Sequence, residues 1–163
     1  MSRAFVKELE RETIDLSDRP VSPHPNFVTK AGRLAIEAAL HRFEAAHKAA
    51  VAKDDERAAA AARREMRYWS SRLASAQVVK ASVDYSRAHF GASVTVRRDD
   101  GREQTFRIVG EDEANPSRGT VSHVAPLARA VIGHAAGEIV EIAGQEAVIL
   151  KIRALRDDAG DPR

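Results

Sequence analysis

Hydrophobic positions between residues 29 and 76 recur at spacings of three and four. The first run is Ile36, Leu40, Phe43, His47 and Ala50, and the second is Ala59, Ala62, Met66, Trp69, Leu73 and Ala76. Such spacing gathers side chains on one face of a helix and is typical of a coiled-coil seam. The segment is rich in alanine and lacks proline, which favours helix. We therefore predict an antiparallel coiled-coil hairpin over residues 29–76, with Thr29 as its N-cap.

The two runs are interrupted at Lys53–Arg57, so the bend of the hairpin is expected there. Three consecutive acids, Asp54, Asp55 and Glu56, would then lie at the tip. Larger side chains, Leu34 and Ile36 among them, are expected to pack the opposite end. The acids have two interpretations: they complement the positive end of the second helix, or they present carboxylates to another molecule.

After residue 77 the hydrophobic period changes to two. Val94, Val96, Phe106 and Ile108 alternate with polar residues, which predicts a β-hairpin whose turn is a type I′-like Asp100-Gly101. Further strands are expected over "TVSHV", "EIVEI" and "EAVILKI", and a short helix over "PLARAVIG", from Pro126 to Gly133. The predicted fold class is α+β: the helical hairpin, then a small antiparallel sheet or partial barrel over residues 77–156 with one short helix.

The two ends of the chain lack these patterns. Residues 1–28 contain "RPVSPHPN", with three of the six prolines in the chain, which predicts an extended or disordered arm. Residues 157–163 are expected to form a loose tail.

Composition excludes several classes of protein. A chain of 163 residues forms one or two small domains. The chain contains no cysteine, so neither a disulfide framework nor a thiolate metal site can form, and the five histidines from His41 to His134 lack ligand spacing. No apolar run approaches 18 residues. We expect a cytoplasmic protein with no membrane partner, no metal site and no cofactor of its own.

The net charge is only +2, and the basic excess lies in the predicted hairpin. The second helix carries a candidate basic face, consisting of Arg57, Arg63, Arg64, Arg67 and Arg72, with Glu65 as the one acid among them. Two interpretations remain open for this face. The arginines solvate an alanine-rich helix, or they contact RNA phosphates or a protein surface.

Three stretches carry a resemblance to a known family: "FGASVTVRRDDGREQTFRIVGEDEA", "SHVAPLARAVIG" and "GEIVEIAG". They resemble the C-terminal domain of the bacterial GreA/GreB transcript-cleavage factors. The family pattern falls on Phe90–Ala92, Phe106–Gly110, Asp112–Glu113, Pro126–Gly133 and Gly137–Val140. The resemblance extends over roughly residues 26–152.

The resemblance implies a fold and a partner. In that family an FKBP-like C-terminal domain docks at the rim of the secondary channel of RNA polymerase, and the coiled-coil hairpin enters the channel. Tip carboxylates help the polymerase hold a catalytic Mg²⁺ that cleaves backtracked RNA, so the Mg²⁺ belongs to the polymerase. The expected partners are RNA polymerase and nascent RNA, and a monomer is expected. The candidate polymerase-binding residues are Val124, Ala125, Pro126 and Arg129.

The chain departs from the family pattern at the tip and at the docking loop. Asp54-Asp55-Glu56 replaces a D-x-x-E-N motif, and Val124-Ala125-Pro126 replaces an Asp-Ser-Pro. We expect helices of about 25 residues, nearly ten shorter than in the cleavage factors, or ~15 Å less reach. The short hairpin resembles a related short-armed family member, Rnk, the regulator of nucleoside diphosphate kinase. Arg129 is either a partner in a local ion pair or part of the docking contact.

Three functional classes follow from these features. The first is an elongation factor whose tip acids promote RNA cleavage, and the second is a polymerase-binding or partner-binding regulator without cleavage. The third is a prolyl isomerase, which the FKBP-like fold suggests by analogy only. An isomerase pocket needs clustered aromatic rings, and residues 77–163 contain only Tyr85, Phe90 and Phe106. The protein is therefore not expected to be an enzyme.

Overall fold

The computed structural model describes residues 16–154 and divides the chain into two compact units. Among the described residues, the helical unit contains residues 16–25 and Arg33–Ala76, and the sheet unit contains Asn26–Gly32 and residues 77–154. The α+β fold class is confirmed. The expected tail at 157–163 and the first 15 residues of the expected arm lie outside the described residues.

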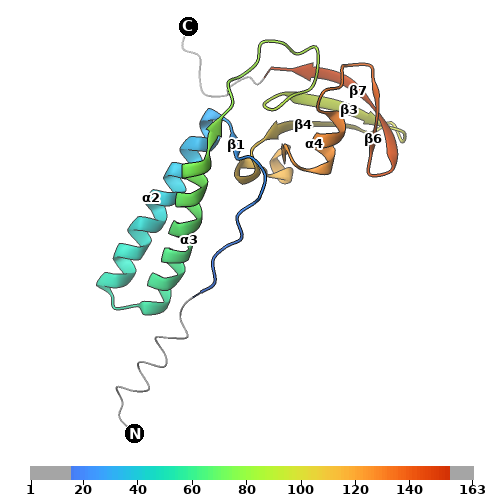
Figure 1. The fold of residues 1–163 in the computed structure, drawn as a ribbon. Helices are drawn as coiled ribbons and strands as arrows, with labels where there is room; N and C mark the ends of the chain where they lie inside the picture. The colour runs from blue at the N-terminus through green and yellow to red at the C-terminus, as the bar shows by residue number, and fades with distance from the viewer. Residues whose placement is uncertain (1–15, 155–163) are drawn as a thin grey trace. The chain divides into compact units, whose positions relative to one another are not determined.

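The helical unit is built on two antiparallel helices (Figure 1). They are α2 at Lys30–Ala52, of 23 residues, and α3 at Glu56–Ser75, of 20 residues. Thr29 is the N-cap as predicted, because its Oγ1 accepts a hydrogen bond from the nitrogen of Gly32 at 2.9 Å. Ile36, Ala50 and Ala59 on the predicted seam are buried. Other seam residues, such as Phe43, are only half-buried. In a hairpin of two helices each helix has a single neighbour, which covers only one side of it.

Two predictions for the hairpin are wrong. Leu34 is 57% exposed and does not pack the hairpin, because two residues along a helix place it about 200° from Ile36. Arg72 is only 1% exposed and does not belong to an exposed basic face. It lies three residues after Trp69, so it extends the inward stripe of α3.

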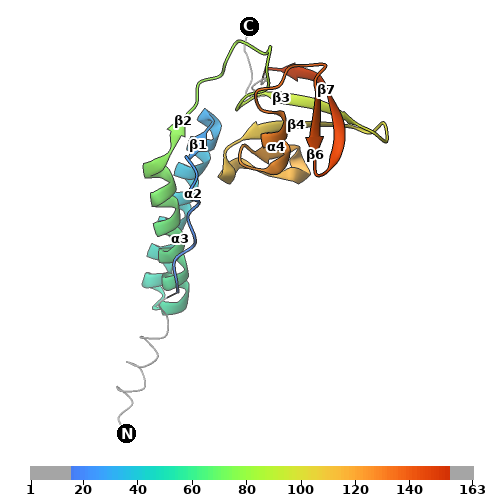
Figure 2. The same cartoon turned by 45° about the vertical axis from the view of Figure 1, so that its right-hand side comes forward.

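The described part of the expected arm has two different environments. Residues 16–25 run along the helices without regular structure (Figure 2). Phe27–Val28 instead form strand β1, which pairs in parallel with β2 at Gln77–Val78. Asn26 and Val28 are buried at 3% and 1% exposure. The end of the predicted arm is therefore an ordered part of the sheet unit.

The sheet unit contains a five-stranded sheet in the order β5-β4-β3-β7-β6. The strands are β3 (Ser93–Arg98), β4 (Glu103–Val109), β5 (Thr120–Ser122), β6 (Ile139–Ile142) and β7 (Gln145–Arg153). All pairs are antiparallel except β4 with β5, which are parallel. The sheet is therefore mixed rather than purely antiparallel. Two 3₁₀ turns, η1 (Glu111–Glu113) and η2 (Pro116–Arg118), carry the chain back between those two strands.

The core of the sheet unit lies between one face of this sheet and the short helix α4 (Pro126–Val131) (Figure 1). The four residues of the predicted alternation are all buried: Val94, Val96, Phe106 and Ile108. Ala128 and Val131 of α4 pack against them. As predicted, Pro126 begins the helix, and Gly133 follows it with a left-handed φ of 87°.

The turn between β3 and β4 differs from the predicted type I′ geometry. Of its residues, only Gly101 has a positive φ, 81°, whereas type I′ requires positive φ at Asp100 as well. The nitrogen of Gly101 donates to the oxygen of Arg98 at 2.9 Å, and the nitrogen of Arg98 donates to the oxygen of Arg102 at 3.0 Å. This is a three-residue loop with a type I turn and a glycine bulge. The extra residue absorbs the turn without strain at Asp100.

Candidate functional site

The tip of the hairpin is a tight turn formed by the three acids and the residue before them. The nitrogen of Asp54 donates to the oxygen of Val51 at 3.1 Å, and that of Asp55 donates to the oxygen of Ala50 at 3.0 Å. Together these bonds form a Schellman motif that ends α2. Asp54 occupies the left-handed position of this motif, with φ 55°, where glycine is usual. The first acid therefore has a backbone role.

The next two acids serve the start of α3. Asp55 is its N-cap, and its Oδ1 accepts a hydrogen bond from the nitrogen of Ala58 at 2.9 Å. Glu56 lies in the first turn of α3, where a negative charge complements the helix dipole. These contacts agree with the first interpretation, in which the acids complement the positive end of the second helix. Asp54 and Asp55 are nevertheless exposed at the tip, so their carboxylates remain accessible to another molecule.

The structure divides the five arginines of the candidate basic face into three groups. Arg57 and Arg63 are exposed. Arg64 donates from Nε to the backbone oxygen of Ser17 at 2.7 Å, and Arg67 donates from Nε to Asp18 Oδ1 at 2.5 Å. Arg72 is buried. Two of the predicted cations are thus in contact with residues 16–18, a relationship that the sequence did not indicate.

The candidate docking loop leads into α4 in the sheet unit. The Oγ of Ser122 accepts from the nitrogen of Val124 at 3.3 Å, and the oxygen of Ser122 accepts from the nitrogen of Ala125 at 2.9 Å. Val124 and Ala125 are half-buried, whereas Pro126 is exposed. The loop is therefore a backbone-fixed and largely apolar surface.

Arg129 lies on the exposed side of α4. Among residues 16–154, no carboxylate forms an ion pair with its guanidinium. The described residues therefore do not support the interpretation of Arg129 as a partner in a local ion pair, and within them its charge is available for an external contact.

Beside this loop lies an aromatic cluster that the sequence did not predict. Phe27, Phe90 and His123 have ring centroids 5.4 to 6.3 Å apart. The three residues come from β1, from the segment before β3 and from the segment after β5, so no periodicity connects them. His123 directly precedes Val124, which places the cluster next to the candidate docking loop.

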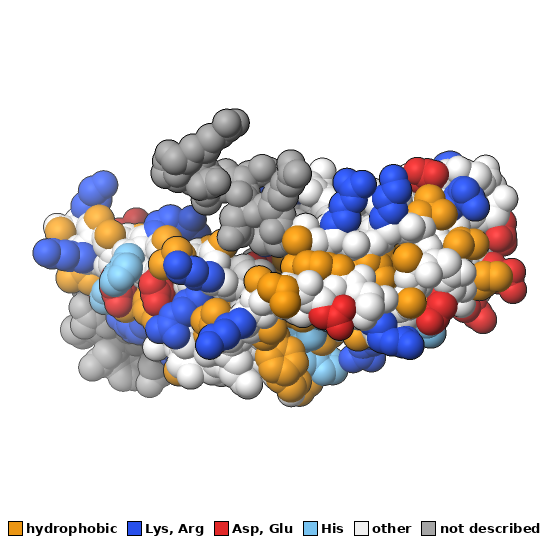
Figure 3. Space-filling model, turned by 90° about the horizontal axis from the view of Figure 1, so that it is seen from above, with side chains coloured by type: hydrophobic (Ala, Val, Ile, Leu, Met, Phe, Trp, Pro, Cys, Tyr) orange, Lys and Arg blue, Asp and Glu red, His pale blue; other side chains and the backbone are white. Residues whose placement is uncertain are grey.

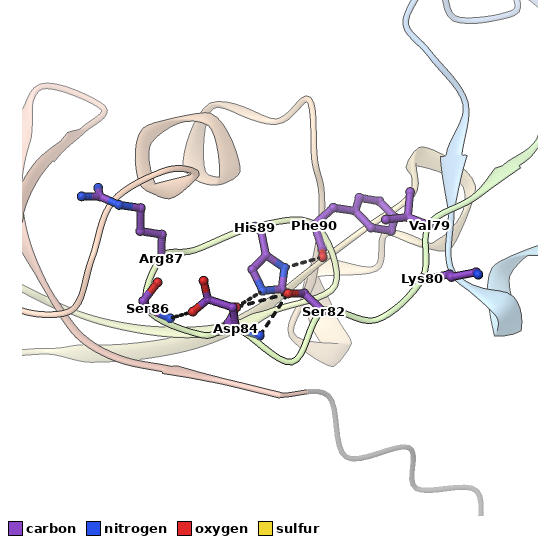
Figure 4. A pocket seen from close by; sticks show the side chains of 8 residues that line it. All are labelled: Val79, Lys80, Ser82, Asp84, Ser86, Arg87, His89 and Phe90. Atoms are coloured by element: carbon purple, nitrogen blue, oxygen red, sulfur yellow. Dashed lines mark hydrogen bonds between the residues drawn. The ribbon is translucent and has the colours of Figure 1, made fainter.

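A hollow of about 330 Å³ in the sheet unit contains serine, aspartate and histidine side chains (Figure 4). It is lined by Val79, Lys80, Ser82, Asp84, Ser86, Arg87, His89 and Phe90. His89 Nδ1 lies 2.8 Å from the oxygen of Phe90, and Nε2 lies 2.9 Å from the backbone oxygen of Asp84. Both ring nitrogens therefore contact backbone oxygens, and neither contacts a serine hydroxyl. The serine, aspartate and histidine side chains are therefore not arranged as a Ser-His-Asp triad. His89 instead holds its own loop together through hydrogen bonds to the backbone.

The carboxylate of Asp84 has the same structural function. It accepts a hydrogen bond from the nitrogen of Ser86 at 2.9 Å. This backbone hydrogen bond, reinforced by a side-chain hydrogen bond with Ser86, lowers the pKa of Asp84 below its ordinary value. Asp84 is therefore held in its charged form by the loop that surrounds it.

Surface charge is mixed over the face shown in Figure 3, where lysine and arginine side chains alternate with acidic and hydrophobic ones. Within residues 16–154, no three histidine, aspartate or glutamate side chains are grouped as ligands for a metal ion. The described helices also include none with the length and apolar character needed to cross a bilayer.

Comparison with known proteins shows which family the chain resembles. Residues 83–156 match the family described as "Transcription elongation factor, GreA/GreB, C-term". GreA of Chloroflexus aurantiacus is 33% identical over 153 positions that cover 79% of this chain and 98% of that protein. Since 79% of 163 residues is about 129, about 24 of the aligned positions are gaps in this chain.

Other relatives match more locally. GreA of Hyphomonas neptunium is 45% identical over 74 residues, 44% of this chain, and the chain spans only about half of that relative's length, 47%. A crystal structure of the GreA factor homolog Gfh1 of Thermus thermophilus covers 80% of this chain and 100% of its own, with 17% identity and a TM-score of 0.40. The match at 33% identity, which covers 98% of the Chloroflexus protein, decides the relationship. The chain belongs to the GreA/GreB family of transcription elongation factors.

Proposed function

We propose that this protein binds bacterial RNA polymerase at its secondary channel and modulates elongation. Membership of the GreA/GreB family supports this proposal, as do the names of relatives that match its sequence. The architecture also supports it, because a helical hairpin and a sheet unit are the two parts that such binding requires. In this proposal the protein acts as a cytoplasmic monomer, and it has no catalytic centre and no cofactor of its own.

The proposed docking surface is the Val124–Pro126 loop together with Arg129. The loop supplies apolar contact area, and Arg129 supplies a charge without a partner among the described residues. Such a surface suits a partner with an apolar patch beside a carboxylate. Because the loop conformation is fixed by Ser122, little ordering is required when the partner binds.

Modulation without RNA cleavage is the activity that the geometry supports best. The observation that carries this proposal is the length of the helices: 23 and 20 residues extend only ~34 and ~30 Å at 1.5 Å per residue. Mg²⁺ requires oxygen ligands at about 2.0–2.1 Å, directly or through one bound water. A deficit of several ångströms therefore prevents a tip carboxylate from helping to hold the metal.

A cleavage-stimulating factor is the second candidate, and the exposure of Asp54 favours it. Of the three acids, Asp54 has the carboxylate that matters least to the turn, because Asp54 contributes to the turn through its backbone conformation. If a different docking pose brings the tip deeper, Asp54 is the residue placed to act with the Mg²⁺ of the polymerase.

The test is an assay on backtracked elongation complexes with and without the protein. The acids must be removed without destroying the turn, so the variants are Asp54→Asn, which tolerates the left-handed conformation, and Asp55→Ser, which retains an N-cap. We expect bound complexes with an altered elongation rate and no shortened RNA, for the wild type and both variants. Shortened RNA that disappears in Asp54→Asn would establish the cleavage factor instead. Absence of polymerase binding would reject both candidates.

Nascent RNA is proposed as a second contact of the hairpin. Arg57 and Arg63 are exposed on α3 near the tip, and phosphate contacts by arginine weaken steeply as the salt concentration rises. Exchange of both residues for glutamine should reduce crosslinking to RNA in the complex while polymerase binding through the sheet unit persists. Unchanged crosslinking would contradict this contact.

A further inference from the structure

Residues 16–19 of the arm contact helix α3 through ion pairs and hydrogen bonds in which each segment supplies both donors and acceptors. From the arm, Asp18 accepts a hydrogen bond from Arg67, and the backbone oxygens of Leu16 and Ser17 accept from Arg67 and Arg64. In return, Arg19 of the arm donates to the carboxylate of Glu65 on α3 at 2.7 Å. All of these residues belong to the helical unit. Each segment therefore donates to the other, and the pairs fix which arm residue lies beside which residue of α3.

Arg19 is the centre of this contact. Its guanidinium lies 3.6 Å from the centroid of the Tyr68 ring and 5.6 Å from that of Trp69, in addition to its ion pair with Glu65. The side chains of Arg19 and Glu65 are 33% and 21% exposed. A cation over an aromatic ring and beside a carboxylate is held by two attractive interactions at once. Among residues 16–19, Arg19 is thus the anchor.

The contact changes what α3 presents to other molecules. Arg64 and Arg67 point their donors at oxygens of the arm, and such donors are those that would bind phosphate oxygens. Arg57 and Arg63 are exposed, and no contact to the arm is found for them within the described residues. The docked residues therefore occupy donors of two of the four arginines of α3 that are not buried, and the side chains of Arg64 and Arg67 are left 33% and 41% exposed.

We propose that residues 16–19 are a displaceable cover over a phosphate-binding face of α3, and that nucleic-acid phosphates compete with this cover. The competition is feasible because exposed ion pairs are individually weak and screened by salt. Phosphate oxygens replace the oxygens of Leu16, Ser17 and Asp18 on the same guanidinium groups. This inference rests on the proposed function only for the source of the nucleic acid, the nascent transcript.

The chain contains a reporter for the docked arm. Trp69 is its only tryptophan, and it lies beside Tyr68 and Arg19. Lifting the arm removes the cation from these rings and changes the emission of Trp69. The variant Arg19→Glu places like charges at the Glu65 contact and should produce that change at low salt, with helix content unchanged by circular dichroism. The double variant Arg19→Glu/Glu65→Arg restores opposite charges and should restore the wild-type emission.

The competition itself is measured as binding of a labelled RNA oligonucleotide of about ten nucleotides, without polymerase. Arg19→Ala removes a positive charge, which alone would weaken RNA binding. If the arm covers the face, the variant should instead bind RNA about two- to fivefold more tightly than the wild type at low salt. This advantage should disappear at high salt. The sign of the effect thus separates uncovering from simple electrostatics.

Arg33→Ala is the matched control. Arg33 is exposed and forms an ion pair with Glu37 on α2, so the variant has the same change in charge and also breaks one exposed pair. We expect equal or slightly weaker RNA binding for it. The proposal is overturned if Arg19→Ala binds RNA no more tightly than Arg33→Ala, or if Trp69 emission is the same in Arg19→Glu and the wild type. Failure to bind polymerase would reject the proposed function and leave these results unchanged.

Discussion

The carboxylate of Glu113 accepts two hydrogen bonds from Thr29, from its nitrogen at 2.8 Å and from its hydroxyl at 2.5 Å. The two residues are separated by 84 positions in the sequence. The first turn of α2 contains no acidic residue, so Glu113 supplies the negative charge that favours the start of a helix. Thr29 in turn caps the nitrogen of Gly32. A residue from η1 therefore completes the N-terminus of α2.

We expect Glu113→Gln to lower the free energy of unfolding by about 1–2 kcal/mol, because an amide provides one acceptor atom and no charge. Urea denaturation measures the change. Glu103→Gln, at an exposed position of β4, is the control and should remain within about 0.5 kcal/mol of the wild type. Equal effects of the two variants would show that the bonds to Thr29 contribute nothing.

Two glycines pack closely around this contact and should respond differently to alanine. A Cβ on Gly110 would lie 2.5 Å from the backbone oxygen of Phe27, whereas a Cβ on Gly32 would lie 2.0 Å from the side chain of Glu113. Backbone cannot move aside as a carboxylate can. Alanine in a helix also gains about 1 kcal/mol over glycine, which offsets part of the cost at Gly32. Gly110→Ala should therefore lower the denaturation midpoint more than Gly32→Ala, and the reverse order would contradict the packing described.

The tip turn predicts opposite signs for neighbouring acids. Asp54→Gly should raise the free energy of unfolding by up to about 1 kcal/mol, because Asp54 has positive φ and glycine adopts it without strain. Asp55→Ala should lower it by about 1 kcal/mol through loss of the N-cap, and Asp55→Ser should restore most of that loss. Thermal unfolding of the three variants tests the assignment. A destabilised Asp54→Gly would disprove the left-handed role.

Glu138 should contribute to the acid sensitivity of the sheet unit. A side-chain hydrogen bond with His134, at 2.6 Å, is the largest cause that lowers the pKa of Glu138 below its ordinary 4.5. A lowered folded-state pKa means that stability is present above 4.5 and lost as pH falls through the folded-state pKa. Glu138→Gln should flatten the dependence of unfolding free energy on pH in this acid range. Glu141→Gln, at an exposed position of β6, should leave the dependence unchanged.

Arg72 should behave as a core residue and Arg63 as a surface residue. Truncation of the buried Arg72 to alanine leaves a cavity and unpaired groups, and we expect a loss of about 2–4 kcal/mol. Arg63→Ala should change stability by less than about 0.5 kcal/mol. Chemical denaturation of both variants measures the two changes in the free energy of unfolding. A neutral Arg72→Ala would contradict the burial.

The features that the sequence predicted are those encoded by neighbours along the chain. The seam at Ala59 and Ala62 and the alternation at Val94 and Val96 are periodic, and a period reports the buried face of an element directly. The N-cap at Thr29 depends on a residue only three positions away. The bend at Lys53–Arg57 was predicted for the same reason, because the periodicity stops there.

The features that the sequence did not predict depend on partners distant in the chain. Glu113 reaches Thr29 and Arg19 reaches Glu65 across 84 and 46 positions, and neither contact leaves a periodic signature. The sequence analysis placed Arg72 on the surface because arginine is charged, although its position three residues after Trp69 puts it on the inward side of α3. At the candidate site, sequence reasoning identified the tip acids and the loop before α4. It could not show that Asp55 is occupied as a cap or that the arm contacts Arg64.

The tight turn at Lys53–Asp55 also constrains how the length of the hairpin can change. α2 ends in a Schellman motif and α3 begins at the adjacent N-cap, so the turn itself has no slack to extend. Longer versions must add residues to both helices in equal number. To keep the seam in register, each addition must be a whole seam repeat of about seven or eleven residues, which advances the tip by ~10 or ~16 Å. Reach in this architecture is therefore quantised, and a tip suited to one depth of insertion cannot be adjusted gradually to another.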